Sequence, residues 1–305
     1  MKKVFIDGSA GTTGLRIRER LAERRDLEVM ILPDELRKDP AARKTALNAA
    51  DVAFLCLPDA AAIEAVKMVE NPETVIIDTS TAHRVNPAWA YGFPELTSLR
   101  EKIVASKRIA NPGCHASGFI ALIRPLIEKG LLDCASKLCA FSLTGYSGGG
   151  KKMIAEYEGE GVGVEFSGGR QYALSQAHKH LPEMAKICGL KFAPVFSPIV
   201  VPNYSGMEVT CQLHGIDLKA VKACYCDYYA HAKLVKFMDN ADQAGFISSA
   251  ALTGRDDMIV TAYGNEDRVI LVSLFDNLGK GASGAAIENM NLALGVDEVE
   301  GLVIG

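Results

Sequence analysis

Cys114 stands in a sequence setting that suits a nucleophilic thiol. It follows the turn residues Asn111, Pro112 and Gly113 and precedes an apolar pattern with helical spacing over residues 119–127. We therefore expect it at or near a helix N-terminus, where the macrodipole and the backbone N–H groups favour thiolate over thiol and can hold an oxyanion. An isolated cysteine is more often a small buried residue, so the neighbouring motifs have to decide.

The remaining cysteines give no sign of a metal site or of disulfide bonds. All eight cysteines of the chain are scattered through apolar surroundings, without a paired CxxC and without the density of a secreted scaffold. This distribution predicts reduced thiols in a cytoplasmic protein. Five of them are interpreted as packing residues: Cys56, Cys134, Cys139, Cys188 and Cys211.

Two histidines could manage the proton that such a thiol chemistry requires. His178 and His180 lie two residues apart, which points both to one side of an extended segment. The residue before Pro182 is driven to extended backbone, and a helix over 182–188 would carry Glu183 in its first turn, where the carboxylate could orient an imidazole. An HxH pair can also bind zinc, but no HExxH or paired CxxC supplies partners, so we expect no metal. Solvated surface histidines are the remaining alternative.

The N-terminal sequence predicts a strand, a glycine turn and a helix. Residues 4–6 form a short apolar run, GSAGTTG follows, and helical spacing continues from Leu15. Gly8 would permit the tight turn, Gly11 a close approach to a pyrophosphate, and Gly14 close packing of helix on strand. The spacing GxxGxxG departs from GxGxxG and also fits a plain turn between a strand and a helix. The candidate coenzyme contacts here are Gly8, Ser9, Ala10, Gly11, Thr12, Thr13 and Gly14.

Further strands in the first hundred residues indicate a parallel sheet. Apolar runs at 28–32, 51–58 and 75–78 alternate with helical patterns such as the one over 60–69. Strands that alternate with helices predict a right-handed, doubly wound α/β sheet of the Rossmann type.

The charged residues after the second strand bear on the choice of coenzyme. Asp34 and Glu35 could bind a ribose diol, as in NAD enzymes, but Arg37 and Lys38 follow at once. Two cations favour a 2′-phosphate, which predicts NADP(H). The alternative is that they are solvated loop charges.

The second half of the chain has a different pattern. Successive strand patterns with few helices between them predict a mixed or largely antiparallel sheet in an α+β domain, and such sheets often form dimer faces. The expected strands are residues 137–144, 196–201, 207–214, 258–263 and 268–274, and Asp217 is expected to cap a helix over 218–237.

Composition excludes several classes of function. A net charge of −4 without a long Lys/Arg block argues against nucleic-acid binding. No apolar segment approaches the length of a membrane span, and the N-terminal apolar run is too short for a signal peptide. A chain of 305 residues with 49% hydrophobic content can bury a large core, so we expect a two-domain cytoplasmic protein.

Motifs along nearly the whole chain resemble one enzyme family. They are GSAGTTG at 8–14, DTSTAHR at 78–84, YGFPEL at 91–96, NPGC at 111–114, GYSGGGKK at 145–152, HKHLPEM at 178–184, FSPIVVP at 196–202 and DNLGKGASGAAIENMN at 276–291. Together they resemble the family of N-acetyl-γ-glutamyl-phosphate reductases and aspartate-semialdehyde dehydrogenases, and within it the short form of the former. The chain departs from the long form by its shorter sequence between the early strands, and from the family's HRH by HKH.

The resemblance implies a division of the chain and an activity. Residues 1–112 and 280–305 would form the NADP-binding domain, and residues 113–279 the catalytic and dimerisation domain of a homodimer or homotetramer. The implied reaction is the NADPH-dependent conversion of N-acetyl-glutamyl phosphate to the semialdehyde, with release of inorganic phosphate, in arginine biosynthesis. Cys114 would form a thioester intermediate.

The resemblance also assigns roles to individual residues. We expect His180 to be the acid/base and His178 to contact substrate or phosphate, although the motif alone does not rank the two. Glu183 would support them. Arg84 and Lys151 (or Lys152) are implied substrate contacts, and Gly148 and Asn277 are expected near the coenzyme, as are Arg37 and Lys38 by their charge. Ser80 and Asn111 close strand-end loops on the side where doubly wound sheets bind ligands, so we expect each to contact coenzyme or substrate, Ser80 the coenzyme and Asn111 the substrate. The glycine run 148–150 is expected to be a mobile or tightly turning loop, and residues 276–281 a loop before the last helix.

Two rival functions follow from the same residues. An aspartate-semialdehyde dehydrogenase would share the fold and the thiol chemistry, and HKHLPEM, YGFPEL and the C-terminal motif argue against it. A non-catalytic NADP-binding regulator would need neither an activated Cys114 nor a proton partner such as His180.

Overall fold

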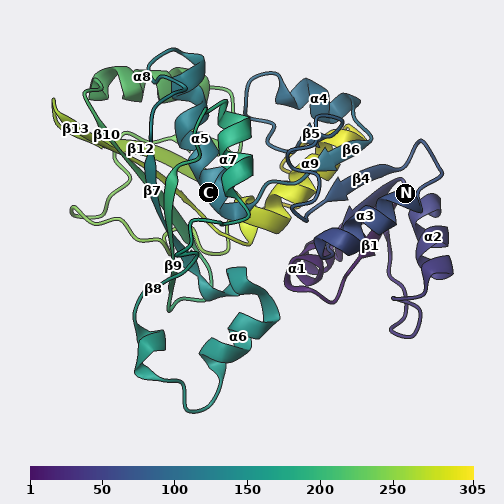
Figure 1. The fold of residues 1–305 in the computed structure, drawn as a ribbon. Helices are drawn as coiled ribbons and strands as arrows, with labels where there is room; N and C mark the ends of the chain where they lie inside the picture. The colour runs from purple at the N-terminus through teal and green to yellow at the C-terminus, as the bar shows by residue number, and fades with distance from the viewer. The chain divides into compact units, whose positions relative to one another are not determined.

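The computed structural model describes residues 1–305, and the chain divides into two compact units. The first unit contains residues 1–112 and 282–302, and the second contains residues 113–281 and 303–305. Figure 1 shows the chain as a ribbon coloured by residue number, with the last helix in yellow. No helix of the chain has both the length and the hydropathy needed to cross a lipid bilayer.

The first unit is built on a six-stranded parallel sheet, which confirms the doubly wound fold predicted from the strand pattern. The central strands β3 and β4 are buried along their whole length because helices cover both faces, which is why they read as continuous apolar runs. The strand order is β2-β1-β3-β4-β6-β5. The strands are β1 Lys2–Asp7, β2 Leu27–Met30, β3 Val52–Leu55, β4 Val75–Asp78, β5 Ala90–Tyr91 and β6 Arg108–Ala110.

This order places a topological switch point between β1 and β3. The chain moves from β1 outward to β2 and then returns to add β3 on the other side of β1. In open parallel sheets, ligands bind outside the carboxyl ends of the strands at this point. The loops after β1 and β3 are therefore the expected ligand-binding loops of this unit.

Helices of the first unit begin at recognisable signals. Asp39 caps α2 by accepting a hydrogen bond from the Ala42 amide, and Pro40 takes the first helical position, where no N–H is needed. The last helix, α9, is buried almost throughout and packs on α4 and β4. The helices are α1 Thr12–Leu21, α2 Pro40–Ala49, α3 Asp59–Lys67, α4 Leu99–Ala105 and α9 Gly284–Leu294.

The second unit contains a seven-stranded mixed sheet, as its strand pattern predicts. The order is β11-β12-β13-β10-β7-β9-β8, with parallel pairs β11/β12 and β7/β9 and antiparallel pairs elsewhere. The strands are β7 Cys139–Gly145, β8 Arg170–Gln171, β9 Val195–Val201, β10 Met207–His214, β11 Val235–Phe237, β12 Met258–Gly264 and β13 Arg268–Phe275.

One face of this mixed sheet carries the helix that begins at Cys114. Helix α5 packs on β10 and β13, and a Cβ at Gly118 would come within 2.5 Å of Val209, so the absence of a side chain there allows close contact with the sheet. The helix accommodates Pro125 and ends at Glu128. The helices of this unit are α5 Cys114–Glu128, α6 Gly150–Glu158, α7 Leu181–Cys188 and α8 Leu218–Tyr228.

Four local expectations are wrong. Helix α8 is capped by Asp217 as expected but ends at Tyr228, because the buried Val235 joins the edge of the sheet as β11, parallel to β12. The glycine run forms a 3₁₀-helix at Tyr146–Gly149 and the first turn of α6, and Gly279–Ser283 is a π-helix instead of a loop. Cys139 is exposed because it falls on the open face of β7.

Candidate active site

Cys114 is the first residue of helix α5, as its sequence predicts. Gly113 precedes the helix with extended backbone and offers no side-chain cap, so the first amides of α5 lie next to the thiol without a competing capping oxygen. The side chain of Cys114 is partly exposed. A Cβ at Gly281 would come within 2.9 Å of the Cys114 Cβ, so glycine at 281 keeps the surroundings of the thiol open.

Glu183 acts on the turn before the nucleophile. Its Oε1 accepts a 2.8 Å hydrogen bond from the backbone N–H of Gly113, and the carboxylate is buried. Glu183 lies in the first turn of α7, as expected, so α7 fixes the start of α5 through this contact.

His178 and His180 lie together beside the residue that follows the nucleophile. Their ring centroids are 4.7 Å apart and lie 5.3 and 5.7 Å from the ring of His115. The extended geometry expected for this segment is wrong: His180 has helical φ and ψ and precedes the first residue of α7, and the Leu181 amide donates to the His178 carbonyl in a turn. The turn, not an alternating strand, brings the two rings together.

The hydrogen-bond pattern determines the protonation of His178. Its Nδ1 accepts a hydrogen bond of 3.1 Å from the backbone N–H of His180. A backbone N–H can only donate, so Nδ1 carries no hydrogen and the neutral ring carries it on Nε2. Burial lowers the pKa of His178 to about 4, which keeps this neutral form at pH 7.

Three further side chains around the thiol were not assigned from the sequence. His115 is buried and contacts the Ser142 hydroxyl through Nδ1 at 2.6 Å and the Tyr172 hydroxyl through Nε2 at 2.7 Å. The position of His115 next to Cys114 could have suggested it. Ser142 and Tyr172 carry no local signal, because only the folded chain brings β7 and the segment after β8 to this place.

The other thiols differ from Cys114 in environment. Burial raises the pKa of Cys56 to about 12 and also raises the pKa values of Cys188 and Cys211, so these thiols stay protonated. Cys188 and Cys211 are buried packing residues, whereas Cys56 lines a pocket of the first unit. All eight cysteines are free. No group of three or more His, Cys, Asp or Glu side chains is placed to hold a metal ion.

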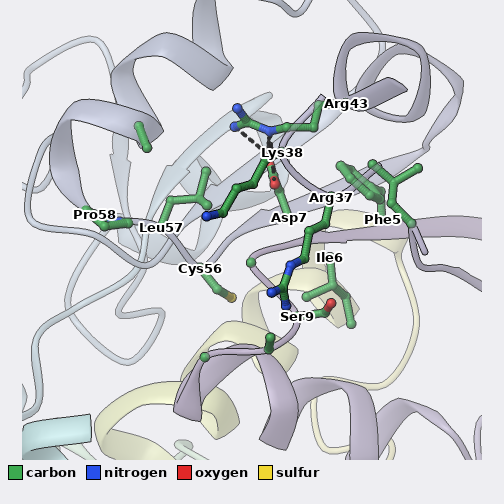
Figure 2. Close-up of a pocket in the computed structure, with 15 residues that line it drawn as sticks. Phe5, Ile6, Asp7, Ser9, Arg37, Lys38, Arg43, Cys56, Leu57 and Pro58 are labelled. Atoms are coloured by element: carbon green, nitrogen blue, oxygen red, sulfur yellow. Dashed lines mark hydrogen bonds and ion pairs between the residues drawn. The ribbon is translucent and has the colours of Figure 1, made fainter. Parts of the chain in front are cut away.

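A pocket of about 350 Å³ lies at the switch point of the first unit (Figure 2). The glycine turn after β1 forms one wall and residues 56–58, after β3, form another. Gly8 has a φ of +88°, and a Cβ there would lie 2.3 Å from the Cys56 carbonyl oxygen, so only glycine fits. The expected residues that line the pocket are Gly8, Ser9, Ala10, Gly11, Arg37 and Lys38.

The start of helix α1 suits a phosphate group. Gly11 caps the helix without a side-chain hydrogen bond, and the buried Thr12 hydroxyl has no hydrogen-bond partner. A Cβ at Gly11 would meet nothing closer than 3.5 Å, so the space beside this turn is open to a ligand. The helix N-terminus, an unpartnered hydroxyl and open space together fit a coenzyme pyrophosphate.

A buried ion pair beside the pocket was not predicted from the sequence. Arg43 of α2 donates to Asp7 at the end of β1, with Nη2 to Oδ2 at 2.8 Å (Figure 2). Asp7, which directly precedes Gly8, is the only local signal. The pair holds α2 against the end of β1, while Arg37 and Lys38 extend into the pocket.

The residues expected at the ends of β4 and β6 make hydrogen bonds within the first unit. Ser80 donates its hydroxyl to Asp78, and Asn111 donates its amide to the Ala282 carbonyl. Arg84 is buried and donates to the carbonyls of Asn111 and Thr79, at 2.9 and 3.0 Å, so it joins the two loops.

Three expected residues lie elsewhere in the second unit. The Asn277 amide donates to Ser147 and accepts from the Gly206 amide, and a Cβ at Gly148 would lie 3.4 Å from its nitrogen. Gly148 and Asn277 are thus neighbours. Lys151 is exposed on α6.

Two family models match the chain over most of its length. Residues 31–105 match the NAD-binding domain of semialdehyde dehydrogenases, and residues 114–277 match their dimerisation domain. Two relatives carry the description N-acetyl-γ-glutamyl-phosphate reductase. The protein of Burkholderia ambifaria is 42% identical over 304 residues, with 96% of both chains covered, and that of Brucella suis is 45% identical over 306 residues, with 96% and 99% covered.

The chain belongs to the N-acetyl-γ-glutamyl-phosphate reductase family. Its fold is also that of solved aspartate-semialdehyde dehydrogenases. The Vibrio cholerae enzyme II matches with a TM-score of 0.72 at 17% identity, covering 96% of this chain and 98% of that one. The Candida albicans enzyme, solved with NADP, matches with a TM-score of 0.67 at 16% identity, covering 96% and 99%. The reductase relatives, not these structures, distinguish between the two branches that the sequence motifs left as rivals.

Proposed function

We propose that this protein is an N-acetyl-γ-glutamyl-phosphate reductase of arginine biosynthesis. The observation that carries this assignment is the identity of 42–45% with reductases of that description over nearly the full length of both chains. The partly exposed Cys114 at the start of α5, with histidines nearby, supplies the chemistry that such a reaction needs.

Cys114 is the nucleophile of this proposal. Its thiolate attacks the acyl carbon of the acyl phosphate, a carbon–sulfur bond forms, and the carbon–oxygen bond to phosphate breaks, releasing inorganic phosphate. The amides at the start of α5 donate to the carbonyl oxygen as it becomes an oxyanion. Glu183 is a positioning residue, because it holds the Gly113 amide that precedes the thiol.

The two histidines take different roles. His178 carries its hydrogen on Nε2 and stays neutral, so it donates a hydrogen bond to substrate oxygen and does not accept a proton there. His180 is then the acid/base that gives the proton to, and removes it from, the oxygen of the thiohemiacetal. These are the roles that the family resemblance led us to expect for the two histidines, which the motif HKHLPEM alone does not rank.

The coenzyme is NADP(H) in this proposal. When bound, NADPH supplies the hydride that reduces the thioester. The N-terminus of α1 with its glycine turn holds the pyrophosphate, and Arg37 and Lys38 bind the 2′-phosphate. The matching NAD-binding family model and the NADP-bound Candida albicans relative support this reading. Ser80, Gly148 and Asn277 are the remaining proposed coenzyme contacts.

Substrate binding is assigned to three polar residues. Arg84 and Asn111 hold the loops after β4 and β6 and remain the proposed contacts for the acidic substrate, together with Lys151 on α6. We place the coenzyme domain at residues 1–112 and 280–305 and the catalytic domain at 113–279. These bounds differ from those of the two compact units at residues 280–281 and 303–305, which belong to the second unit.

The open face of the mixed sheet supports a homodimer or a homotetramer. Alternate residues of β7, β9 and β13 leave Phe141, Val195 and Ile270 exposed on this sheet at 44%, 57% and 40%. Exposed apolar side chains in a strand arrangement are typical of an interface between protein copies. The matching family model is a dimerisation domain. Sedimentation velocity of wild type and Phe141→Glu tests this assembly, which the substitution is expected to weaken.

The reaction is tested in the reverse direction. Purified protein, NADP and inorganic phosphate are combined with N-acetyl-glutamate semialdehyde or, in parallel, with aspartate semialdehyde. We expect phosphate-dependent formation of NADPH with the acetylated substrate alone. Turnover of aspartate semialdehyde instead would move the protein to the other branch, and no turnover of either would favour a non-catalytic coenzyme-binding role.

A further inference from the structure

The segment that carries the two histidines has little regular structure of its own. Residues 172–180 lie between β8 and α7 and form neither helix nor strand. Ala173 and Gln176 have positive φ angles of 52° and 57°, and Leu174 is 73% exposed. A segment with exposed apolar residues and strained backbone needs external contacts to hold a fixed geometry. We call residues 172–180 the histidine segment.

Hydrogen bonds from two residues of the histidine segment attach it to the backbone of strand β9. The Gln176 side-chain amide pairs with the Phe196 backbone, donating to its carbonyl and accepting from its amide, both at 2.8 Å. The Tyr172 amide donates to the Pro198 carbonyl at 3.1 Å. These bonds fix the segment to β9, but none of them reaches the helix that carries Cys114.

His115 supplies the contact with helix α5. Its Nε2 meets the Tyr172 hydroxyl at 2.7 Å, and its Nδ1 meets the fully buried Ser142 hydroxyl of β7 at 2.6 Å. The same ring packs edge-on against His178, with centroids 5.3 Å apart. One side chain of helix α5 therefore contacts both the sheet and the two ends of the histidine segment.

The chemistry of this bridge is that of a neutral, fixed ring. Burial lowers the pKa of His115 to about 3, so the ring has one donor and one acceptor nitrogen at pH 7. Both are used, one on each hydroxyl. Burial, and to a lesser extent negative charge on Cys114, raises the pKa of Tyr172, so its hydroxyl stays protonated beside the thiolate. The bridge carries no charge that would compete with the acid/base.

We infer that His115 is a positioning residue that, through Tyr172, fixes the histidine segment against the start of helix α5. The inference rests on the proposed function, since it concerns the distance between Cys114 and its proton partners. A phenylalanine at 115 would keep the ring contacts with His178 and Phe196 but lose both hydrogen bonds. Tyr172→Phe would remove the same bridge from its other end.

The test compares His115→Phe, Tyr172→Phe and the double variant with a matched control, Tyr228→Phe. The control removes a hydroxyl that donates to Glu128 on the exposed side of the same unit. Each variant is measured for kcat and KM, for hydrogen exchange of peptides spanning 172–181, and for the rate of Cys114 alkylation. Tyr172→Phe keeps the test valid if His115→Phe does not fold.

We expect both single variants to lower kcat about 10- to 100-fold with a smaller change in KM, because misplaced catalytic groups lower the rate more than binding. The kcat of the double variant should be no lower than that of either single variant, since both substitutions remove the same hydrogen bond between His115 and Tyr172. Exchange over 172–181 should rise in both and not in the control. His115→Gln, whose amide can reach Tyr172, should restore part of kcat.

Two results would overturn the inference. One is exchange over 172–181 that matches the control in both variants, and the other is a kcat within twofold of the control. If wild type shows no reductase activity, the proposed function fails on its own. Hydrogen exchange and alkylation then still test whether His115 positions the histidine segment. Faster exchange over 172–181 with an altered alkylation rate of Cys114 supports this role, and values equal to those of the control reject it.

Discussion

The candidate sites of the two units are built from different groups: a glycine turn in the first unit and individually placed side chains in the second. In the first unit the turn after β1 consists of glycines and small residues, so this wall of the pocket carries few side-chain atoms. In the second unit, side chains from β7, the histidine segment and α7 hydrogen-bond to Gly113 and His115, the two neighbours of Cys114. A pyrophosphate is held well by repeated N–H groups, whereas a thiol that forms and breaks covalent bonds needs individually placed donors and acceptors.

The largest expected effect separates the two units by chemistry. Cys114→Ser should lower kcat/KM about 10⁴-fold or more, because the alkoxide of serine is hard to form without a stronger base. Coenzyme binding should be unchanged, since the glycine turn lies in the other unit. Isothermal titration with NADPH and steady-state kinetics check both statements. A parallel loss of coenzyme affinity would contradict the separation.

Substitutions at two glycines of the turn after β1 form a matched pair that separates protein stability from coenzyme binding. Gly8→Ala places a Cβ 2.3 Å from the Cys56 carbonyl at positive φ, so the free energy of unfolding should fall by at least about 2 kcal/mol. Gly11→Ala has room within the protein and should leave stability nearly unchanged while raising the Kd for NADPH. Urea unfolding and coenzyme titration distinguish the two. Equal effects on stability would show that ligand approach is not the reason for glycine at 11.

The two cations of the pocket sharpen the comparison, because they are charged side chains that line the same pocket as the glycine turn. Replacing both Arg37 and Lys38 by Ala should raise the KM for NADPH about 10- to 100-fold and leave the KM for NADH nearly constant. Lys219→Ala, on α8 of the other unit, is the control. A similar rise for both coenzymes would mean that the cations do not bind the 2′-phosphate.

The smallest expected effect concerns the buried rings of the second unit. The pKa values of His115 and His178 are lowered to about 3 and about 4, so the unfolded chain binds more protons as the pH falls below about 6.5. Stability should therefore be complete above pH 6.5 and decrease toward acid. Between pH 7.5 and 5.0 we expect a loss of about 1–2 kcal/mol, mainly from His115, because water screens the more exposed His178.

The same unfolding series in His115→Phe provides the check on this pH dependence. Its loss of stability over the interval should be clearly smaller than in wild type, because the substituted ring cannot take up a proton in the unfolded chain. An identical slope in wild type and variant would assign the acid sensitivity to other groups.

Local patterns were sufficient for the regular elements and for the two sites as separate motifs. The fully buried strands, the glycine turn and the start of α5 at Cys114 depend on near neighbours in sequence, and each was predicted. Where the prediction failed, a distant partner decided. Residues 235–237 leave the expected helix because they pair with residues 258–260 of β12, which only the folded chain brings beside them.

The sequence by itself determined that this chain has a glycine turn between a strand and a helix, a cysteine at a helix start and a pair of histidines in one motif. Only the tertiary structure decided what surrounds them. His115 meets Ser142 and Tyr172 across 27 and 57 residues, and Asp7 meets Arg43 across 36. Such contacts depend on packing of whole elements in three dimensions, which no local spacing encodes, and the burial that goes with this packing keeps His115 neutral. The tautomer of His178, by contrast, is set locally, by the hydrogen bond from the His180 amide two residues away.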